Sequence, residues 1–335
     1  MESLMRFQNK NRIAYLGALT LLFSYAETIL PRIVPFFRLG LGNIVILLAF
    51  DLNFPSFLLL TIIKALTSCL MSGTLFSPFF LISLAQSIIS GLAMYALALA
   101  NSKTKNKLAS LYGISILGST VSAFVQIFLS SLYLGSGTNA LLGPLLIFSL
   151  FSGIFTAFFS QILHIPKQAP ELISSQKIQK NQKKQPVLLI ALLILLASAS
   201  IFMINNLIIL LVALILSLFF QILSKRKIYI LPHLTLWIFV IISTILIPNG
   251  KILYKIGDFS ITQGALLDGI RKATKLSAVS ALSQCAASLR PNGNGLVSLV
   301  LAYFGGLNKA FRDAEGEGNF IGKLKVVLRA EKLEG

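Results

Sequence analysis

The sequence predicts an all-α polytopic membrane protein, with about ten transmembrane helices arranged in two modules. Hydrophobic residues make up 56% of the 335 residues and charged residues only 12%, whereas soluble domains carry roughly 25% charged residues. Apolar runs of about 17 to 23 residues recur along the chain, and each is long enough to cross roughly 30 Å of hydrocarbon as a helix. Short basic clusters separate the runs, which is typical of loops between membrane helices.

The predicted membrane segments fall into a set of six and a set of four. The second segment is short, and only the Asp51 to Pro55 stretch separates it from the third. A broken or re-entrant unit is therefore the alternative to two full spans at this point. The first set covers residues 13–30, 40–52, 54–72, 78–100, 108–133 and 141–163, and the second covers 187–203, 206–223, 229–248 and 261–289.

Loop charge predicts the orientation in the membrane. Basic residues gather in the N-terminal arm and after the fourth, sixth and eighth segments, whereas the alternate connections MSGTLFSP, GSGTN and INN carry none. By the positive-inside rule, we expect both termini in the cytoplasm of a bacterial cell, with the chain in its cytoplasmic membrane. The net charge of +18 then belongs to loops, and no nucleic-acid partner is expected. Four basic residues fall on the wrong side: Arg32, Arg38, Lys251 and Lys255.

A polar, Lys- and Gln-rich stretch, HIPKQAPELISSQKIQKNQKKQP, divides the chain. It predicts a membrane module over residues 1–165, a cytoplasmic linker over 166–186, and a second membrane module with a cytoplasmic tail over 187–335. The tail contains LVSLVLAYFGGLNKAF and KLKVVLRAEKL, which have the pattern of amphipathic helices at the cytoplasmic surface.

Small residues on the first segment predict a helix-docking face. Ala14 and Ala18 are one turn apart, with Gly17 alongside, and this small-xxx-small spacing lets another helix approach closely. Docking between the two modules is one interpretation. Packing within the first module is the other.

Polar residues near the outer end of the first module predict a substrate-binding site. Glu27 would cost about 2.5 to 3.5 kcal/mol facing lipid at mid-bilayer, so it should face a cavity or a cation such as Arg32 or Arg38. In RLGLGN the glycines allow a tight turn with free amides, which favours anions, and Arg38 adds a bidentate donor. An ion pair that only fixes the loop, and a Lys64 that only snorkels, are the alternatives. The candidate binding residues are Glu27, Arg32, Arg38, Gly40, Gly42, Asn43, Lys64, Gln86 and Gln126.

The last predicted membrane segment is unusually charged, since Arg271, Lys272 and Lys275 accompany Asp268. Three cations at this depth cannot all meet lipid. Either the helix packs inside a protein complex, or its first turns lie along the membrane surface and the true span begins near Lys275.

No motif predicts catalysis or a metal site. The string GEGNFIGKL has one residue too many between its glycines for a phosphate loop, and Leu324 replaces the Ser or Thr. No paired-aspartate, HExxH or nucleophile–base motif is present. Cys69 and Cys285 have no neighbouring His or second Cys, so neither a disulfide nor zinc is predicted.

Residues 13–163, with AYLGALTLLFSYAETILP, FFRLGLGNIVILLAF and the MSGTLFSPFF turn, resemble the Gx transporter family, often labelled heptaprenyl diphosphate synthase component I. That family is similar to the S, or substrate-binding, components of energy-coupling factor (ECF) transporters. Residues 187–290, with GDFSITQGALLDGIRKATKL, resemble the T component of the same transporters.

The resemblance implies that the chain is no enzyme and moves a vitamin-like anionic solute, with flavin nucleotide as the best candidate. It further implies ATPase subunits and a flavin transferase or redox complex as partners, with no covalent cofactor. Two other interpretations stay open: a membrane subunit of isoprenoid synthesis, as the family label says, and an assembly scaffold for an electron-transfer complex.

Overall fold

The computed structural model is built almost entirely of helices, with two short two-stranded sheets among its described residues. Arg32 and Arg38 lie outside the described residues, as does most of the predicted linker. The structure describes residues 2–29, 40–104, 108–163, 165–166, 168–173, 187–226, 228, 230–256, 259–286, 295–314, 320–330 and 332–334.

The first module is a bundle in which the third to sixth α-helices begin and end close to the predicted segments, whereas the first helix begins at Glu2 rather than near residue 13. Asn53 caps the third helix by accepting a hydrogen bond from the Ser56 amide at 3.3 Å, and Ser110 caps the fifth by accepting one from the Gly113 amide at 3.2 Å. Such caps satisfy amides that have no partner within the helix. The helices are α1 (Glu2–Ile29), α2 (Gly42–Leu47), α3 (Phe54–Ser72), α4 (Pro78–Lys103), α5 (Leu111–Leu134), η1 (Ser136–Leu141) and α6 (Leu142–Ile162).

The prediction of a full membrane span over residues 40–52 is wrong. α2 has six residues, which rise only about 9 Å, and turns follow it before Asn53 caps α3. The structure therefore favours the alternative, a broken unit in which a short helix packs against α1 and α6 before α3 begins. Its apolar residues are buried against the bundle, which explains why the sequence there is as hydrophobic as a spanning segment.

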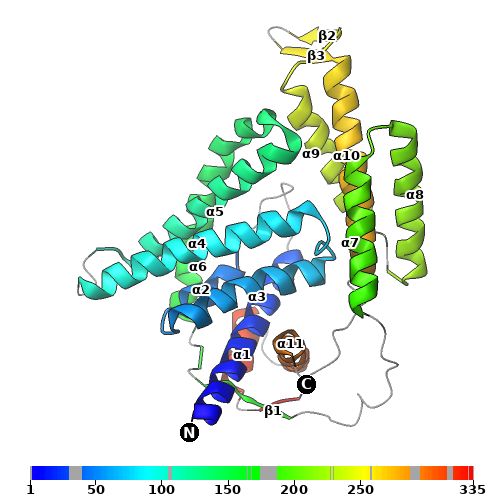
Figure 1. Cartoon of the computed structure of the whole chain (residues 1–335). Helices are drawn as coiled ribbons and strands as arrows, with labels where there is room; N and C mark the ends of the chain where they lie inside the picture. Colours follow the sequence, from blue (N-terminus) through cyan, green and yellow to red (C-terminus); the bar gives the residue numbers. More distant parts are fainter. Residues whose placement is uncertain are drawn as a thin grey trace.

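The second module surrounds one central helix. Helix α10 contacts α7, α8 and α9 along its length, and Figure 1 shows it between them. Asn206 caps α8 by accepting from the Ile208 amide at 2.9 Å. The elements are α7 (Val187–Met203), α8 (Leu207–Leu223), α9 (Ile230–Ile245), the antiparallel hairpin β2 (Ile252–Ile256) and β3 (Phe259–Thr262), and α10 (Gln263–Ala286).

Several helices have the length and composition of membrane spans. Among the described residues, Pro78–Lys103, Leu111–Leu134 and Ser136–Ile162 are long and apolar enough to cross a bilayer. Shorter apolar helices occupy Phe54–Leu70, Leu189–Met203, Leu207–Leu223 and His233–Ile245. These helices support a helical, membrane-embedded protein, whereas the predicted count of ten spans is not reproduced.

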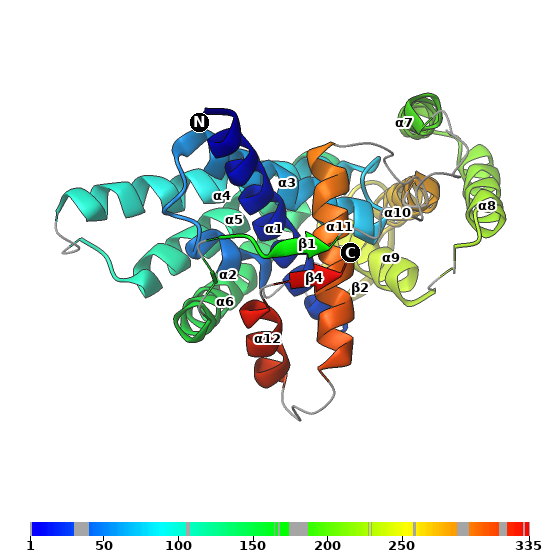
Figure 2. The ribbon, with the colours of Figure 1, turned by 90° about the horizontal axis from the view of Figure 1, so that it is seen from below.

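The C-terminal tail folds back onto the first module (Figure 2). It comprises α11 (Leu296–Asp313), α12 (Phe320–Arg329) and β4 (Lys332–Glu334), and β4 pairs in parallel with β1 (Glu171–Ile173). The Tyr303 hydroxyl donates to the Pro170 carbonyl at 3.2 Å, and burial raises the pKa of Tyr303, which keeps this donor protonated.

The apolar faces of the tail helices are covered by protein rather than by a membrane surface. Helix α11 packs along α1, and Leu324, Val327 and Leu328 of α12 are buried in the same core as α1. The predicted amphipathic helices are therefore present, but their apolar faces dock onto the first module.

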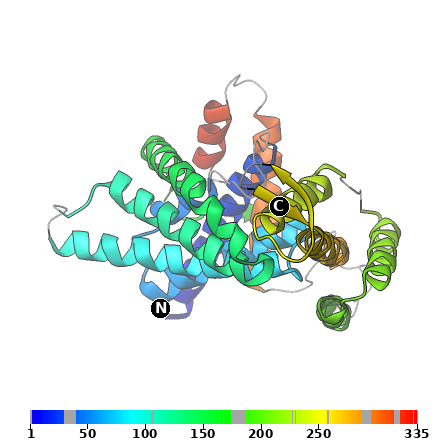
Figure 3. The same ribbon diagram turned by 90° about the horizontal axis from the view of Figure 1, so that it is seen from above.

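The first module lies crosswise to the second. The Phe76 amide donates to Ser283 Oγ at 2.9 Å, and Lys272 Nζ donates to the Leu134 carbonyl at 2.8 Å. Lys272 and Ser283 are roughly 16 Å apart along α10, at about 1.5 Å per residue. One end of the first module therefore contacts α10 at two positions that lie far apart along this helix. Figures 1 and 3 show α4 and α5 running across the direction of α7 and α10.

Candidate functional site

Glu27 and Gly40 form the first part of a polar site between α1, α2 and α3. Glu27 lies near the end of α1, and its Oε1 accepts a hydrogen bond from the Gly40 amide at 3.0 Å. Gly40 has φ +69°, a left-handed conformation that costs other L-residues roughly 1–2 kcal/mol. Glycine thus presents its amide to the carboxylate at the entrance to α2.

Asn43 and Lys64 form the second part. Lys64 Nζ on α3 donates to Asn43 Oδ1 on α2. Gly42 makes this possible, because a Cβ there would lie 3.1 Å from Ser24 Oγ and 3.4 Å from Lys64 Cε. The Ser68 hydroxyl donates to Ser24 Oγ at 3.4 Å and continues the polar line across α1 and α3. We call Ser24, Glu27, Gly40, Asn43, Lys64 and Ser68 the α1–α3 polar cluster.

The α1–α3 polar cluster is set in apolar surroundings. Phe23, Ile44 and Val45 beside it are almost fully buried, whereas Glu27, Asn43 and Lys64 are half-buried. Polar groups in a low-dielectric environment interact more strongly than in water. The cluster offers one carboxylate, one ammonium group, one amide and two hydroxyls, a set that suits a polar or anionic small molecule.

The structure brings together five of the nine predicted binding residues: Glu27, Gly40, Gly42, Asn43 and Lys64. Glu27 was expected to face Arg32 or Arg38, and both arginines lie outside the described residues. Its described partner is the Gly40 backbone amide, and the pairing with an arginine stays a prediction. Ser24 and Ser68 were not predicted, because serine is common in membrane helices and only the packing of α1 on α3 places these two together.

Gln86 and Gln126 form a second polar group. Gln86 Nε2 on α4 donates to Gln126 Oε1 on α5 at 3.0 Å and to the Ser122 carbonyl at 3.2 Å. Hydrogen bonds of this kind hold neighbouring helices together in membranes. In this structure the two glutamines thus have a helix-pairing role.

The predicted helix-docking residues lie where α1 meets the tail. Ala14 and Ala18 have no exposed surface. A Cβ at Gly17 would lie 3.0 Å from Ile63 on α3 and 3.2 Å from Val300 on α11. The small face of α1 therefore contacts both its own module and the C-terminal tail.

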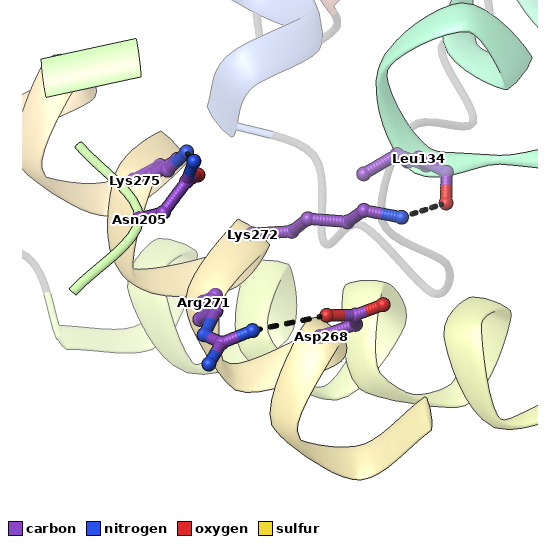
Figure 4. Close-up of polar contacts among 6 residues, drawn as sticks. All are labelled: Leu134, Asn205, Asp268, Arg271, Lys272 and Lys275. Carbon is purple, nitrogen blue, oxygen red and sulfur yellow. Dashed lines mark hydrogen bonds and ion pairs between the residues drawn. The ribbon is translucent and has the colours of Figure 1, made fainter. Parts of the chain in front are cut away.

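The lysines of α10 bind the C-terminal ends of two other helices (Figure 4). Lys272 Nζ donates to the carbonyl of Leu134, the last residue of α5. Lys275 Nζ donates to the Phe202 carbonyl near the end of α7 at 2.9 Å, and to Asn205 Oδ1 at 3.1 Å. Helix C-termini carry unpaired carbonyls and a partial negative charge, which favour such cations.

These contacts give the cations of the charged segment partners within the chain. Arg271 pairs with Asp268 at 3.5 Å, and each lysine has a carbonyl partner in another helix. The cations of α10 therefore have polar partners in this structure, and both interpretations of the segment stay predictions. Their partners could not be read from the sequence, because Leu134 lies 138 positions from Lys272.

One groove in the described residues is apolar and separate from the α1–α3 polar cluster. It has a volume of about 390 Å³ and is lined by Tyr112 on α5 and by Phe151, Ile154, Phe155 and Phe158 on α6. In the part of the chain that the structure describes, no three His, Cys, Asp or Glu side chains lie close enough together to hold a metal ion.

The fold and the buried polar groups define a helical membrane protein of several spans. Residues 16–163 match the family described as heptaprenyl diphosphate synthase component I. The matched region contains every residue of the α1–α3 polar cluster. Residues 184–287 match a domain of unknown function, DUF8519. No curated protein and no solved structure matches the chain.

The two matched regions follow the division of the chain. The first ends with α6 and the second contains α7 to α10, while the tail from α11 onward lies outside both. The second match does not name a T component, so the predicted S and T fusion has no support from it and stays a prediction.

Proposed function

We propose that the chain is the membrane subunit of a transporter and that its first module binds a vitamin-like anionic small molecule. The observation that carries this proposal is the α1–α3 polar cluster. Three segments of an apolar bundle contribute a carboxylate, an amide and an ammonium group to one place. Ionisable groups in membrane segments are costly and are typical of substrate or ion pathways.

Lys64 is the residue that suits an anion. Its ammonium group carries a full positive charge and already donates to Asn43, so the amide holds it in position. Glu27 acts through the backbone, since it accepts from the Gly40 amide and fixes the turn into α2. Lys64 and Asn43 would contact the solute, and Arg32 and Arg38, which precede α2 in the sequence, would add positive charge.

The crosswise arrangement suggests how the solute moves. Helices of both modules have the composition of membrane spans, and crosswise helices cannot all stand upright in one bilayer. We infer that the first module changes its tilt relative to the second during transport. The small face of α1 would slide against α11, because Gly17 has no side chain and lies directly against Val300 of α11.

Flavin nucleotide is the solute that the family resemblance favours, and its phosphate is compatible with Lys64. ATPase subunits would supply energy, and a flavin transferase or redox complex would receive the flavin. The subunit would lie in the bacterial cytoplasmic membrane with both termini in the cytoplasm.

The test is mass spectrometry of small molecules retained by the detergent-purified protein. The proposal expects an anionic solute, with FMN or FAD as the leading candidate, whose amount falls in Lys64→Met and Asn43→Leu. Lys272→Met is the matched control, since it removes a lysine that binds a carbonyl outside the cluster. Retention that is equal in all three variants would contradict the site.

A second candidate is a membrane subunit of isoprenoid synthesis. The description of the family that matches residues 16–163 favours it. The diphosphate-binding aspartates would then belong to a partner chain, because the sequence has no paired-aspartate motif. Retention of a prenyl diphosphate in the same experiment, with prenyl elongation on adding a synthase partner, would favour this function over transport.

A further inference from the structure

The β2–β3 hairpin projects beyond the ends of α9 and α10 and exposes a run of large apolar side chains (Figure 1). Ile252 is 56% exposed, Leu253 53% and Tyr254 64%. Lys251 and Lys255 flank this run and are also exposed. In water, such a protruding strand would be a liability for aggregation.

The hairpin is fixed to the membrane helices at its base. The Asn249 amide donates to Thr262 Oγ1 at 2.8 Å, and the Gln263 amide donates to the Lys251 carbonyl at 2.8 Å. These two hydrogen bonds join the end of the α9 segment to the start of α10. The position of the hairpin relative to the membrane is therefore determined by α9 and α10, to which it is joined.

The apolar surface of α9 continues into the hairpin. Ile242, Leu246 and Ile247 are exposed on the path from α9 to β2, and the run Ile252 to Tyr254 extends the same surface. Exposed apolar residues of an apolar helix are followed, after the short turn at residues 248–251, by an exposed apolar strand, which indicates that both meet the same surroundings. This continuity favours lipid over a soluble partner as the occupant.

We infer that the β2–β3 hairpin is an interfacial anchor that lies in the headgroup layer of the membrane. Tyr254 matches the aromatic residues found at membrane–water boundaries, and Lys251 and Lys255 can extend their ammonium groups to lipid phosphates. The two lysines that break the positive-inside pattern thus have a role: they bind headgroups of the leaflet on their own side.

The depth follows from the backbone. β2 pairs with β3 on one edge only, so its other edge carries unpaired N–H and C=O groups. Such groups cannot enter the hydrocarbon core, but water and headgroups satisfy them at the interface. The hairpin therefore lies flat in the headgroup region and does not insert further.

The test places a tryptophan on the hairpin. Tyr254→Trp is made in a Trp237→Phe background, so that the chain contains one tryptophan, and the full chain is reconstituted in bilayers of phosphatidylglycerol and phosphatidylcholine. Bromine is attached to the acyl chains either near the headgroup or near the chain end. We expect strong quenching by the shallow bromines, weak quenching by the deep ones, and protection from iodide in the water phase.

Two control positions calibrate the measurement. Phe220→Trp on the exposed face of α8 should be quenched by acyl-chain bromines, and Val326→Trp on α12 should be quenched by iodide. Lys251→Glu with Lys255→Glu should reduce the shallow quenching of Tyr254→Trp. Full quenching of Tyr254→Trp by iodide, with none by bromine, would overturn the anchor and leave this surface to a soluble partner.

Discussion

At the scale of single residues, the site depends on two glycines that let two charged side chains reach neutral polar partners. Gly40 adopts φ +69° and directs its amide to Glu27, while Gly42 leaves the space through which Lys64 passes to Asn43. The two glycines therefore determine where the Glu27 and Lys64 side chains lie, and these side chains supply the charges of the proposed binding site.

Gly40→Ala should lower the melting temperature of the purified protein. The left-handed conformation costs an alanine roughly 1–2 kcal/mol, and the new Cβ would also lie 3.1 Å from Asn43 Nδ2. Gly143→Ala is the matched control, because nothing lies within 4 Å of a Cβ there, and alanine stabilises a helix interior by roughly 0.5–1 kcal/mol. Equal melting temperatures for the two variants would contradict the role given to Gly40.

Lys272→Met should also destabilise the protein, by about 1–2 kcal/mol, because it leaves the end of α5 without its cation. The melting temperature reports the loss. Lys251→Met removes an exposed lysine from the same side of the module and should leave the melting temperature nearly unchanged in detergent. If both variants melt alike, the Lys272–Leu134 contact does not stabilise the fold.

The sequence could predict a polar site in the first module, because polar residues are rare in such apolar segments. It could not predict which of the polar groups bind one another. The residues predicted and brought together are Glu27, Gly40, Gly42, Asn43 and Lys64. No sequence pattern reveals that the main-chain amide of Gly40 donates to Glu27, and the predicted arginine partner of Glu27 stays a prediction. The roles of Lys272 and Lys275 were hidden for a similar reason, since their partners are backbone carbonyls.

At the scale of elements, the contact between α1 and α11 joins the two ends of the chain. Gly17 lies against Val300, and the rings of Tyr15 and Tyr303 meet edge to face with centroids 5.8 Å apart. The parallel pair β1–β4 adds a second connection. The tail therefore closes over the face of α1 that the sequence marks as a docking surface.

Gly17→Leu should loosen α11. The added side chain meets Ile63 and Val300, and overpacking of this kind costs about 1–3 kcal/mol. Hydrogen exchange measured along α11 should become faster, while α4 stays unchanged. Gly305→Leu on α11 itself, where nothing lies within 4 Å, is the control and should not alter exchange; faster exchange in both variants would point to a general loss of stability.

Most element boundaries follow from apolar length and helix caps. The segments 54–72 and 187–203 coincide with α3 and α7, and Asn53 and Asn206 mark the starts of α3 and α8. α2 was overestimated because its burial inside the bundle gives it the hydrophobicity of a span. The pair β1–β4 was missed because strands of three residues carry no detectable alternation.

At the scale of the whole molecule, one end of the first module contacts α10 along much of the length of this helix. Sequence patterns predict each module separately, and their relative placement depends on contacts between distant segments, such as Phe76 with Ser283. A Cβ at Gly73 would lie 3.2 Å from Gln284 Cβ, which places this loop at the far end of α10 from Lys272.

Cysteine cross-linking in native membranes tests this placement. With Cys69→Ser and Cys285→Ser as background, Gly73→Cys with Gln284→Cys should form a disulfide after a shift of a few tenths of an ångström, since the two Cβ positions are 3.2 Å apart and a disulfide needs about 3.5–4.5 Å. Gly73→Cys with Lys272→Cys should not, because Lys272 is roughly 18 Å away along α10. If the helices of the first module ran parallel to α10, the Gly73→Cys and Lys272→Cys pair should cross-link and the Gly73→Cys and Gln284→Cys pair should not. Formation of both cross-links would indicate that the module changes its tilt.

The most direct test of the central claim is the affinity of the purified protein for FMN, measured by equilibrium dialysis. Hydrogen bonds to charged groups contribute about 1.5–3 kcal/mol, so Lys64→Met should weaken FMN binding about 10- to 100-fold, while Lys272→Met should bind as the unaltered chain does. Unchanged affinity in Lys64→Met would contradict an anion site in the α1–α3 polar cluster, and no FMN binding by the unaltered chain would contradict the flavin assignment.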